Sequence, residues 1–133
     1  MTCGGRAERM GSDHRRRLRC LVVGNEEGLA EGVAQMLESM GHSVARVWSG
    51  QEAISRFSAA RFDLVMIDGQ ERREAARAIK DTAPSTWVIL TTGNPSLFEA
   101  DGVDVIMHKP FSKDDLVRAL RTFMRRNAPD QKR

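Results

Sequence analysis

The chain has 133 residues, of which 41% are hydrophobic and 29% charged, a composition that suits a single globular domain with its own core. No apolar stretch approaches the roughly 20 residues of a membrane span, and the N-terminal arginines are not followed by the apolar segment of a secretory signal. The two cysteines, Cys3 and Cys20, form no spaced pair and no metal-binding pattern. These features predict a reduced, cytoplasmic protein with no membrane attachment.

The formal net charge of +3 comes from the two ends of the chain. Residues 1–19 carry a net charge of +4 and residues 118–133 carry +5, whereas residues 20–117 carry −6. A nucleic-acid-binding domain places its basic patch on the folded body, and this body is acidic. We therefore expect the basic ends to be solubilising flanks, without sequence-specific binding of nucleic acid.

Three segments are predicted. Residues 1–18 are polar, rich in Gly and Arg and without periodicity, which indicates a disordered basic arm, and Met10 is an alternative start. Residues 19–125 form the folded domain, and residues 126–133 form a basic tail. No output domain follows the last expected helix, so we expect the protein to act by binding other proteins.

Within the domain, apolar runs alternate with segments of helical spacing. The strands are expected at 20–23, 43–48, 62–68, 87–92 and 103–108, and the helices at 29–40, 49–60, 71–83, 95–100 and 112–124. The fourth of these helices is short, and capping patterns begin the second at Ser49 and the last at Ser112. Strands joined by helical crossovers pair in parallel, so the pattern predicts an α/β fold with one parallel sheet between two layers of helices.

Polar residues end three of the expected strands: Asp68, Thr92 and Lys109. The carboxyl ends of parallel strands share one edge, where ligands gather. An aspartate there can accept a phosphoryl group, while a lysine neutralises its charge and a threonine hydroxyl binds one of its oxygens. The alternative reading is structural: Asp68 caps the next helix and Lys109 is solvated.

Longer motifs carry a resemblance to a known family. They are the apolar run before Asp68, the pair Thr92-Gly93, the triplet Gly102-Val103-Asp104, and Lys109-Pro110-Phe111 leading into Ser112. From about residue 19 to residue 124 the chain resembles the response-regulator receiver domain of two-component signalling. The resemblance implies a flavodoxin-like, doubly wound sheet of strand order 2-1-3-4-5, and a cis peptide bond at Lys109–Pro110.

The same resemblance implies roles for single residues. Asp68 is the expected phosphoacceptor, Thr92 the switch hydroxyl, with Thr91 as its replacement if the register slips by one, and Lys109 the phosphate-binding lysine. A histidine kinase or phosphotransfer protein would be the phosphoryl donor, and an unknown protein the downstream target. Such a domain is not an enzyme beyond self-phosphorylation and autodephosphorylation.

The chain also departs from the family pattern. Receivers usually hold Mg²⁺ with an acidic pair after the first strand, and here Gly24 and Asn25 stand in those positions. We expect only a weakened Mg²⁺ site, made by Glu26 and Asp68 with Asn25 and Gln70. The loop after Asp68 and the helix at 95–100 are short, and Ile106 replaces the usual aromatic residue of the fifth strand.

Two functions therefore remain open. The first is a stand-alone receiver phosphorylated on Asp68, and the second is a pseudo-receiver that binds proteins without phosphorylation. An aspartate-based phosphatase or a nucleotide binder is a more distant alternative, although no Gly-rich phosphate loop follows the first strand. Because the fourth helix is trimmed, the first and last helices are the expected partner surface. We assign no catalytic role to His14, His42 or His108, and place Trp48 and Trp87 in or beside the core.

Overall fold

A computed structural model describes residues 17–24, 27–59, 61–68 and 72–126. The elements are β1 (Arg19–Val23), α2 (Glu27–Ser39), β2 (Ser43–Val47), α3 (Gly50–Ala59), β3 (Leu64–Asp68), α4 (Arg72–Thr82), β4 (Trp87–Thr92), β5 (Val105–His108) and α5 (Lys113–Arg126). The strands form one sheet in the order β2-β1-β3-β4-β5, and every pair of neighbours is parallel. The predicted fold class and strand order are confirmed.

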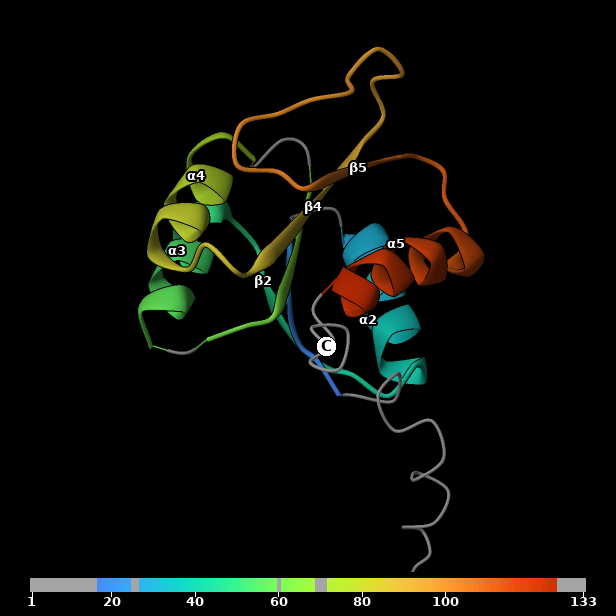
Figure 1. The fold of residues 1–133 in the computed structure, drawn as a ribbon, viewed down its shortest axis with the longest axis horizontal. Coiled ribbons are helices and arrows are strands. Elements are labelled where there is room, and N and C mark those ends of the chain that lie inside the picture. The colour runs from blue at the N-terminus through green and yellow to red at the C-terminus, as the bar shows by residue number, and fades with distance from the viewer. Residues whose placement is uncertain (1–16, 25–26, 60, 69–71, 127–133) are drawn as a thin grey trace, which may run out of the picture.

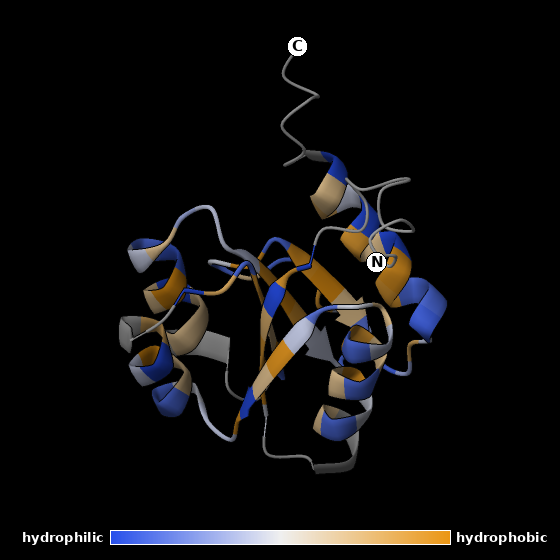
Figure 2. Ribbon diagram, turned by 90° about the horizontal axis from the view of Figure 1, so that it is seen from below, coloured by the Kyte–Doolittle hydropathy of each residue, from blue (hydrophilic) through white to orange (hydrophobic). Residues whose placement is uncertain are grey.

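The helices cover the two faces of the sheet in pairs. Figure 1 shows α3 and α4 on one face and α2 and α5 on the other. The strands lie between these layers and carry many hydrophobic residues, whereas hydrophilic and hydrophobic residues alternate along the helices (Figure 2). Every residue of β3 and β4 is buried, as the continuous apolar runs of their sequences indicate.

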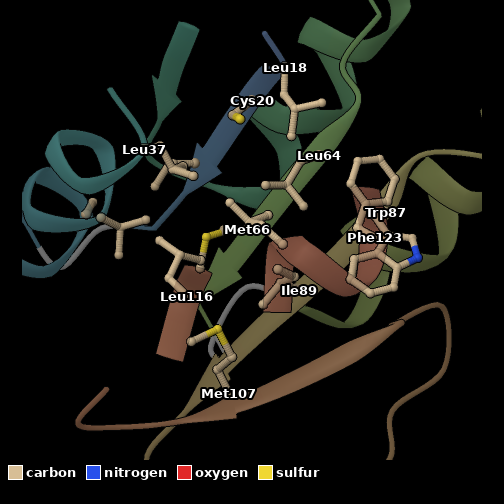
Figure 3. Close-up of a cluster of buried hydrophobic side chains, with 14 residues drawn as sticks. Leu18, Cys20, Leu37, Leu64, Met66, Trp87, Ile89, Met107, Leu116 and Phe123 are labelled. Carbon is tan, nitrogen blue, oxygen red and sulfur yellow. The ribbon is translucent and has the colours of Figure 1, made fainter. Parts of the chain in front are cut away.

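Each face of the sheet has its own hydrophobic cluster. On the α2 and α5 face, Trp87 of β4 packs against Phe123 of α5 with 5.1 Å between ring centroids (Figure 3). On the α3 and α4 face, Phe57 lies 5.6 Å from Phe62, measured between ring centroids. These clusters fix both faces of β3 and β4, and therefore the place where each of these strands ends.

The last helix begins with the expected capping pattern. The N–H of Asp115 donates to the hydroxyl of Ser112 at 3.2 Å, and the carboxylate of Asp115 accepts the N–H of Ser112 at 2.8 Å. Hydrogen bonding to Ser112 holds the pKa of the Asp115 carboxyl below its usual value. The backbone N–H of Ser112 has the largest effect, and its hydroxyl has the next largest. This cap fixes the start of α5 just after Pro110 and Phe111, so it also orients the end of β5.

The helix expected at 95–100 is absent, and that prediction is wrong. Residues 93–104 instead form short turns and bends joined by irregular backbone. The N–H of Asn94 donates to the hydroxyl of Thr92 at 3.0 Å, and the N–H of Ser96 donates to the side-chain oxygen of Asn94 at 3.0 Å. These local hydrogen bonds hold the chain in turns directly after β4, and six residues are too few to offset the cost of helix nucleation.

Two other expectations differ from the structure. Leu18, which the sequence places in the disordered arm, is fully buried in the cluster that contains Trp87. The rest of the predicted arm up to residue 16 lies outside the described residues. Trp48 is 49% exposed, whereas Trp87 is buried. Trp48 follows the outer strand β2, where no further strand of the sheet covers it.

Candidate functional site

Asp68 is the last residue of β3 and lies at the carboxyl edge of the sheet. Its neighbours β1 and β4 hold it on both sides, and it is in register with Thr91 of β4. Like the rest of the strand, Asp68 is buried, with an exposed fraction of 9%. An anionic side chain in such a place requires nearby charge or hydrogen-bond donors.

Lys109 supplies that charge. Its Nζ lies 3.2 Å from Oδ2 of Asp68, although 41 residues separate the two in the chain. The N–H of Lys109 donates to the carbonyl oxygen of Thr92 at 2.8 Å, and the Lys109–Pro110 peptide bond is cis, as the sequence predicts. The structure therefore brings the predicted pair Asp68 and Lys109 together, across the intervening strand β4.

Both candidate threonines are buried at the end of β4. Thr91 is in register with Asp68, and it lines the same small pocket as Asp68. Thr92 is in register with His108, and its hydroxyl accepts the N–H of Asn94. The strand register thus places Thr91 beside Asp68. The sequence analysis gives Thr91 only as the replacement for Thr92.

Gly24 stands directly opposite Asp68. The N–H of Gly24 donates to the carbonyl oxygen of Val47 at 3.1 Å, which extends the pairing of β1 and β2 by one residue. A Cβ atom on Gly24 would lie 3.1 Å from the Cβ of Asp68. Beside them, a small pocket between the sheet and α2 is walled by apolar side chains, among them Ala30, Val33 and Met66.

The fit of a metal ion can be tested only for the described residues. Three of the predicted ligands, Asn25, Glu26 and Gln70, lie outside them. Among the described residues, no group of three or more His, Cys, Asp or Glu side chains is placed to hold a metal ion. Of the described strand ends, only that of β3 carries a carboxylate, and the ammonium of Lys109 already contacts it. The described part of the edge does not by itself fit a divalent cation.

Other reactive side chains lie elsewhere. His108 does not contact Asp68 in any described interaction: its Nε2 is 2.8 Å from the carbonyl oxygen of Leu97, and its ring is 5.2 Å from that of Phe98. Cys20 is buried in β1, and burial, with a smaller contribution from the charge of Asp63, raises the pKa of its thiol to about 12. Neither residue contacts Asp68 or Lys109 in any described interaction.

Comparison with known proteins gives one consistent result. The sequence profile of the response regulator receiver domain matches residues 20–121. The response regulator MprA of Mycolicibacterium vanbaalenii is 28% identical over 122 residues, which cover 85% of this chain and 53% of MprA. The chain thus spans about half the length of the curated relatives it matches.

Solved structures agree with this match. A response regulator receiver domain protein from Clostridium thermocellum is 25% identical, with a TM-score of 0.72 over 81% of this chain and 94% of that one. The receiver domain of the sensor histidine kinase PA1611 from Pseudomonas aeruginosa, solved with a magnesium ion in its active site cleft, is 22% identical. Its TM-score is 0.73 over 82% of this chain and 98% of that one, a likeness of fold. In the part of the chain that the structure describes, no helix is long and apolar enough to span a bilayer.

Proposed function

The chain belongs to the response regulator receiver domain family of two-component signalling, and we propose that it receives a phosphoryl group on Asp68. The proposal extends to the cytoplasm as its location, to a histidine kinase or phosphotransfer protein as donor, and to signalling through contacts with a further protein. Receiver domains are signalling domains, in general not enzymes, and chemistry beyond self-phosphorylation and autodephosphorylation is not proposed.

One observation carries this proposal: the 3.2 Å contact between Lys109 Nζ and Asp68 Oδ2. An exposed ion pair would say little, because such pairs form readily and contribute little. In this pair the side chain of Asp68 is 10% exposed and that of Lys109 26%, and both project from the carboxyl edge where parallel sheets bind ligands. The pair places a cation beside a largely buried carboxylate at this edge of the sheet.

The chemistry follows from this arrangement. An oxygen of the Asp68 carboxylate attacks the phosphorus of a phosphohistidine, the new O–P bond forms as the N–P bond breaks, and the imidazole nitrogen keeps the electron pair and takes a proton. The product is an acyl phosphate, which carries two negative charges in place of the single charge of the carboxylate. The ammonium of Lys109 is positioned to offset that increase, and a hydroxyl from Thr91 or Thr92 would bind a phosphoryl oxygen.

A divalent cation is a further part of the proposal. Glu26 and Asp68 would hold Mg²⁺ weakly, with Asn25 and Gln70 as neutral oxygen donors, and the bound ion would neutralise charge on the phosphoryl group. With Gly24 in place of an acid, this site has less negative charge than one with a full acidic pair. The contribution of Lys109 to phosphorylation should be correspondingly large.

The test is incubation with acetyl phosphate or phosphoramidate over a range of Mg²⁺ concentrations, followed by intact-mass measurement. We expect a mass increase of one phosphoryl group, lost in Asp68→Asn and retained in Asp101→Asn. Asp101 is a matched carboxylate because it is exposed and paired with Arg77, away from the site. A phosphorylated Asp68→Asn protein would contradict the assignment, and absence of phosphorylation at every Mg²⁺ concentration would favour the pseudo-receiver.

A further inference from the structure

The outer edge of β2 carries two residues that no role above involves, Arg46 and Trp48. Arg46 lies within β2, and Trp48 is the first residue after the strand ends at Val47. The guanidinium carbon of Arg46 lies 5.1 Å from the centre of the Trp48 ring. Trp48 is 49% exposed, and Phe98 is the other exposed large hydrophobic residue among those the structure describes. An exposed tryptophan beside an arginine is the pair of residue types that dominates protein interfaces.

Arg46 lacks part of its expected hydrogen bonding. Its Nε is shielded from solvent and has no hydrogen-bond partner within the described residues. A guanidinium donor that is removed from water without an acceptor is unfavourable unless something else supplies the acceptor. A carboxylate provides the planar, two-oxygen acceptor that best matches the guanidinium, so an anionic group is the partner that Arg46 favours.

The backbone of β2 is also available on this side. The N–H of Ser43 and the carbonyl oxygen of Val47 bond to Leu18 and Gly24 on the β1 side. Because the direction alternates along a parallel strand, the N–H and carbonyl of Val44 and Arg46 point to the outer side. Within the described sheet β2 is an outer strand, and β1 is its partner. This outer side is therefore an edge to which another strand can add.

We propose that the β2 edge binds an extended segment of a partner protein that adds as a strand and carries an acidic side chain two positions from an apolar one. The acid would pair with Arg46 and the apolar residue would lie on the ring of Trp48. A second copy of this chain fits less well, because Ser43–Val47 contains an arginine and no acid. Two such strands would contribute Arg46 twice and no carboxylate. The edge thus favours a different chain with negative charge.

The experiment is selection of a phage-displayed library of random linear peptides on the full chain, followed by measurement of Kd for the enriched peptides. We expect an acidic residue and an apolar residue two positions apart, with perturbation of the backbone amide signals of Val44 and Arg46 in NMR spectra. Trp48→Ala should weaken binding at least about tenfold, and Arg46→Lys should weaken it several-fold because it keeps the charge but loses the planar pair of donors. Phe98→Ala is the matched control and should leave Kd unchanged.

Four outcomes would overturn the proposal. They are a failure to enrich any peptide, enrichment of peptides without Asp or Glu, equal binding by Trp48→Ala, and a dimer in sedimentation that Trp48→Ala dissociates, which would make a second copy the occupant. Circular dichroism of Trp48→Ala and Arg46→Lys separates loss of binding from loss of folding. The readout is peptide binding, so the result is independent of whether Asp68 accepts a phosphoryl group.

Discussion

Polar side chains lie at both ends of the parallel strands, but they are used differently at the two ends. At the amino edge they bond to the backbone of a neighbouring strand. His42, Asp63 and Asp104 each immediately precede a strand, and they accept the backbone N–H groups of Leu18, Arg19 and Val88 at 3.1, 2.9 and 2.8 Å. At this edge the polar groups complete the sheet and face little that a ligand could use.

At the carboxyl edge the polar side chains contact one another. Lys109 Nζ contacts Asp68 Oδ2, and Thr91 is in register with Asp68. The amino-edge residues instead accept main-chain N–H groups. The comparison separates residues that stabilise the sheet from residues that we propose take part in chemistry. Substitutions at the amino edge should therefore lower stability, and substitutions at the carboxyl edge should slow phosphorylation.

The largest expected effect is on chemistry at the carboxyl edge. Lys109→Met removes the ammonium beside Asp68 while keeping an unbranched side chain, so the rate of phosphorylation by phosphoramidate should fall by ~10²–10³-fold, the usual loss for one group that stabilises transition-state charge. Lys113→Met, at the exposed start of α5, is the matched control and should phosphorylate at the normal rate. Equal rates for the two variants would remove Lys109 from the site.

At the amino edge the expected effect is on stability. Asp104 accepts the N–H of Val88 and lies 2.7 Å from Nζ of Lys80, so Asp104→Ala leaves two partly buried donors without this carboxylate. The free energy of unfolding in urea should fall by about 1–3 kcal/mol. The matched Asp101→Ala, which loses an exposed ion pair with Arg77, should change it by less than about 0.5 kcal/mol. If Asp104→Ala slowed phosphorylation without destabilising the fold, the two edges would not be separate.

A second comparison lies within the carboxyl edge, between the end of β1, where Gly24 stands, and the end of β3, which carries Asp68. Gly24→Asp with Asn25→Asp restores the acidic pair, and we expect Mg²⁺ affinity to rise by about tenfold or more, because the ion requires anionic oxygen. Gly24→Ala is the control, since it adds the same Cβ at 3.1 Å from Asp68 without the charge. Mg²⁺ titrations followed by NMR chemical shifts measure all three proteins. An unchanged affinity in the double variant would indicate that the short loop after Asp68 limits metal binding.

The sequence predicted the carboxyl edge well because its signals are local. Asp68 and Lys109 each lie at the end of an apolar run, and parallel strands place those ends at one edge of the sheet. The amino-edge residues were not predicted. Their signal is a single polar residue before each run, as with His42 and Asp63, and such a residue is equally common in a solvated loop. Only the register of neighbouring strands shows that it meets a backbone N–H.

Two predictions failed for reasons that the sequence pattern does not contain. An apolar run does not tell whether its strand is central or outer, so the exposure of Trp48 depended on the strand order. The spacing around Pro95 allowed a short helix, but the hydrogen bonds of Thr92 and Asn94 to nearby N–H groups stabilise turns instead. In both cases tertiary or side-chain contacts decided the outcome over local periodicity.

The smallest expected effect is the pH dependence of one amino-edge bond. Nδ1 of His42 accepts the N–H of Leu18, which requires that nitrogen to be unprotonated. Burial, and then the charge of Arg17, lower the pKa of His42 below its ordinary value of 6.5, although the charge of Asp63 partly opposes them. Below pH 6.5 the unfolded chain therefore binds the proton more readily than the folded one.

The stability that this bond contributes is present above pH 6.5 and is lost as the pH falls below it, toward the lowered pKa of the folded state. The size of the loss is set by the difference between the pKa of His42 in the unfolded and in the folded chain. His42→Asn keeps a side-chain acceptor for the Leu18 N–H but cannot titrate, so its urea unfolding free energy should change less between about pH 7.5 and about pH 5.5. His42→Val has no acceptor and should be less stable at both pH values, with an equally small pH dependence. If His42→Asn kept the full pH dependence of the unaltered protein, another group would be responsible, and the amino edge would be a fixed scaffold over this range of pH.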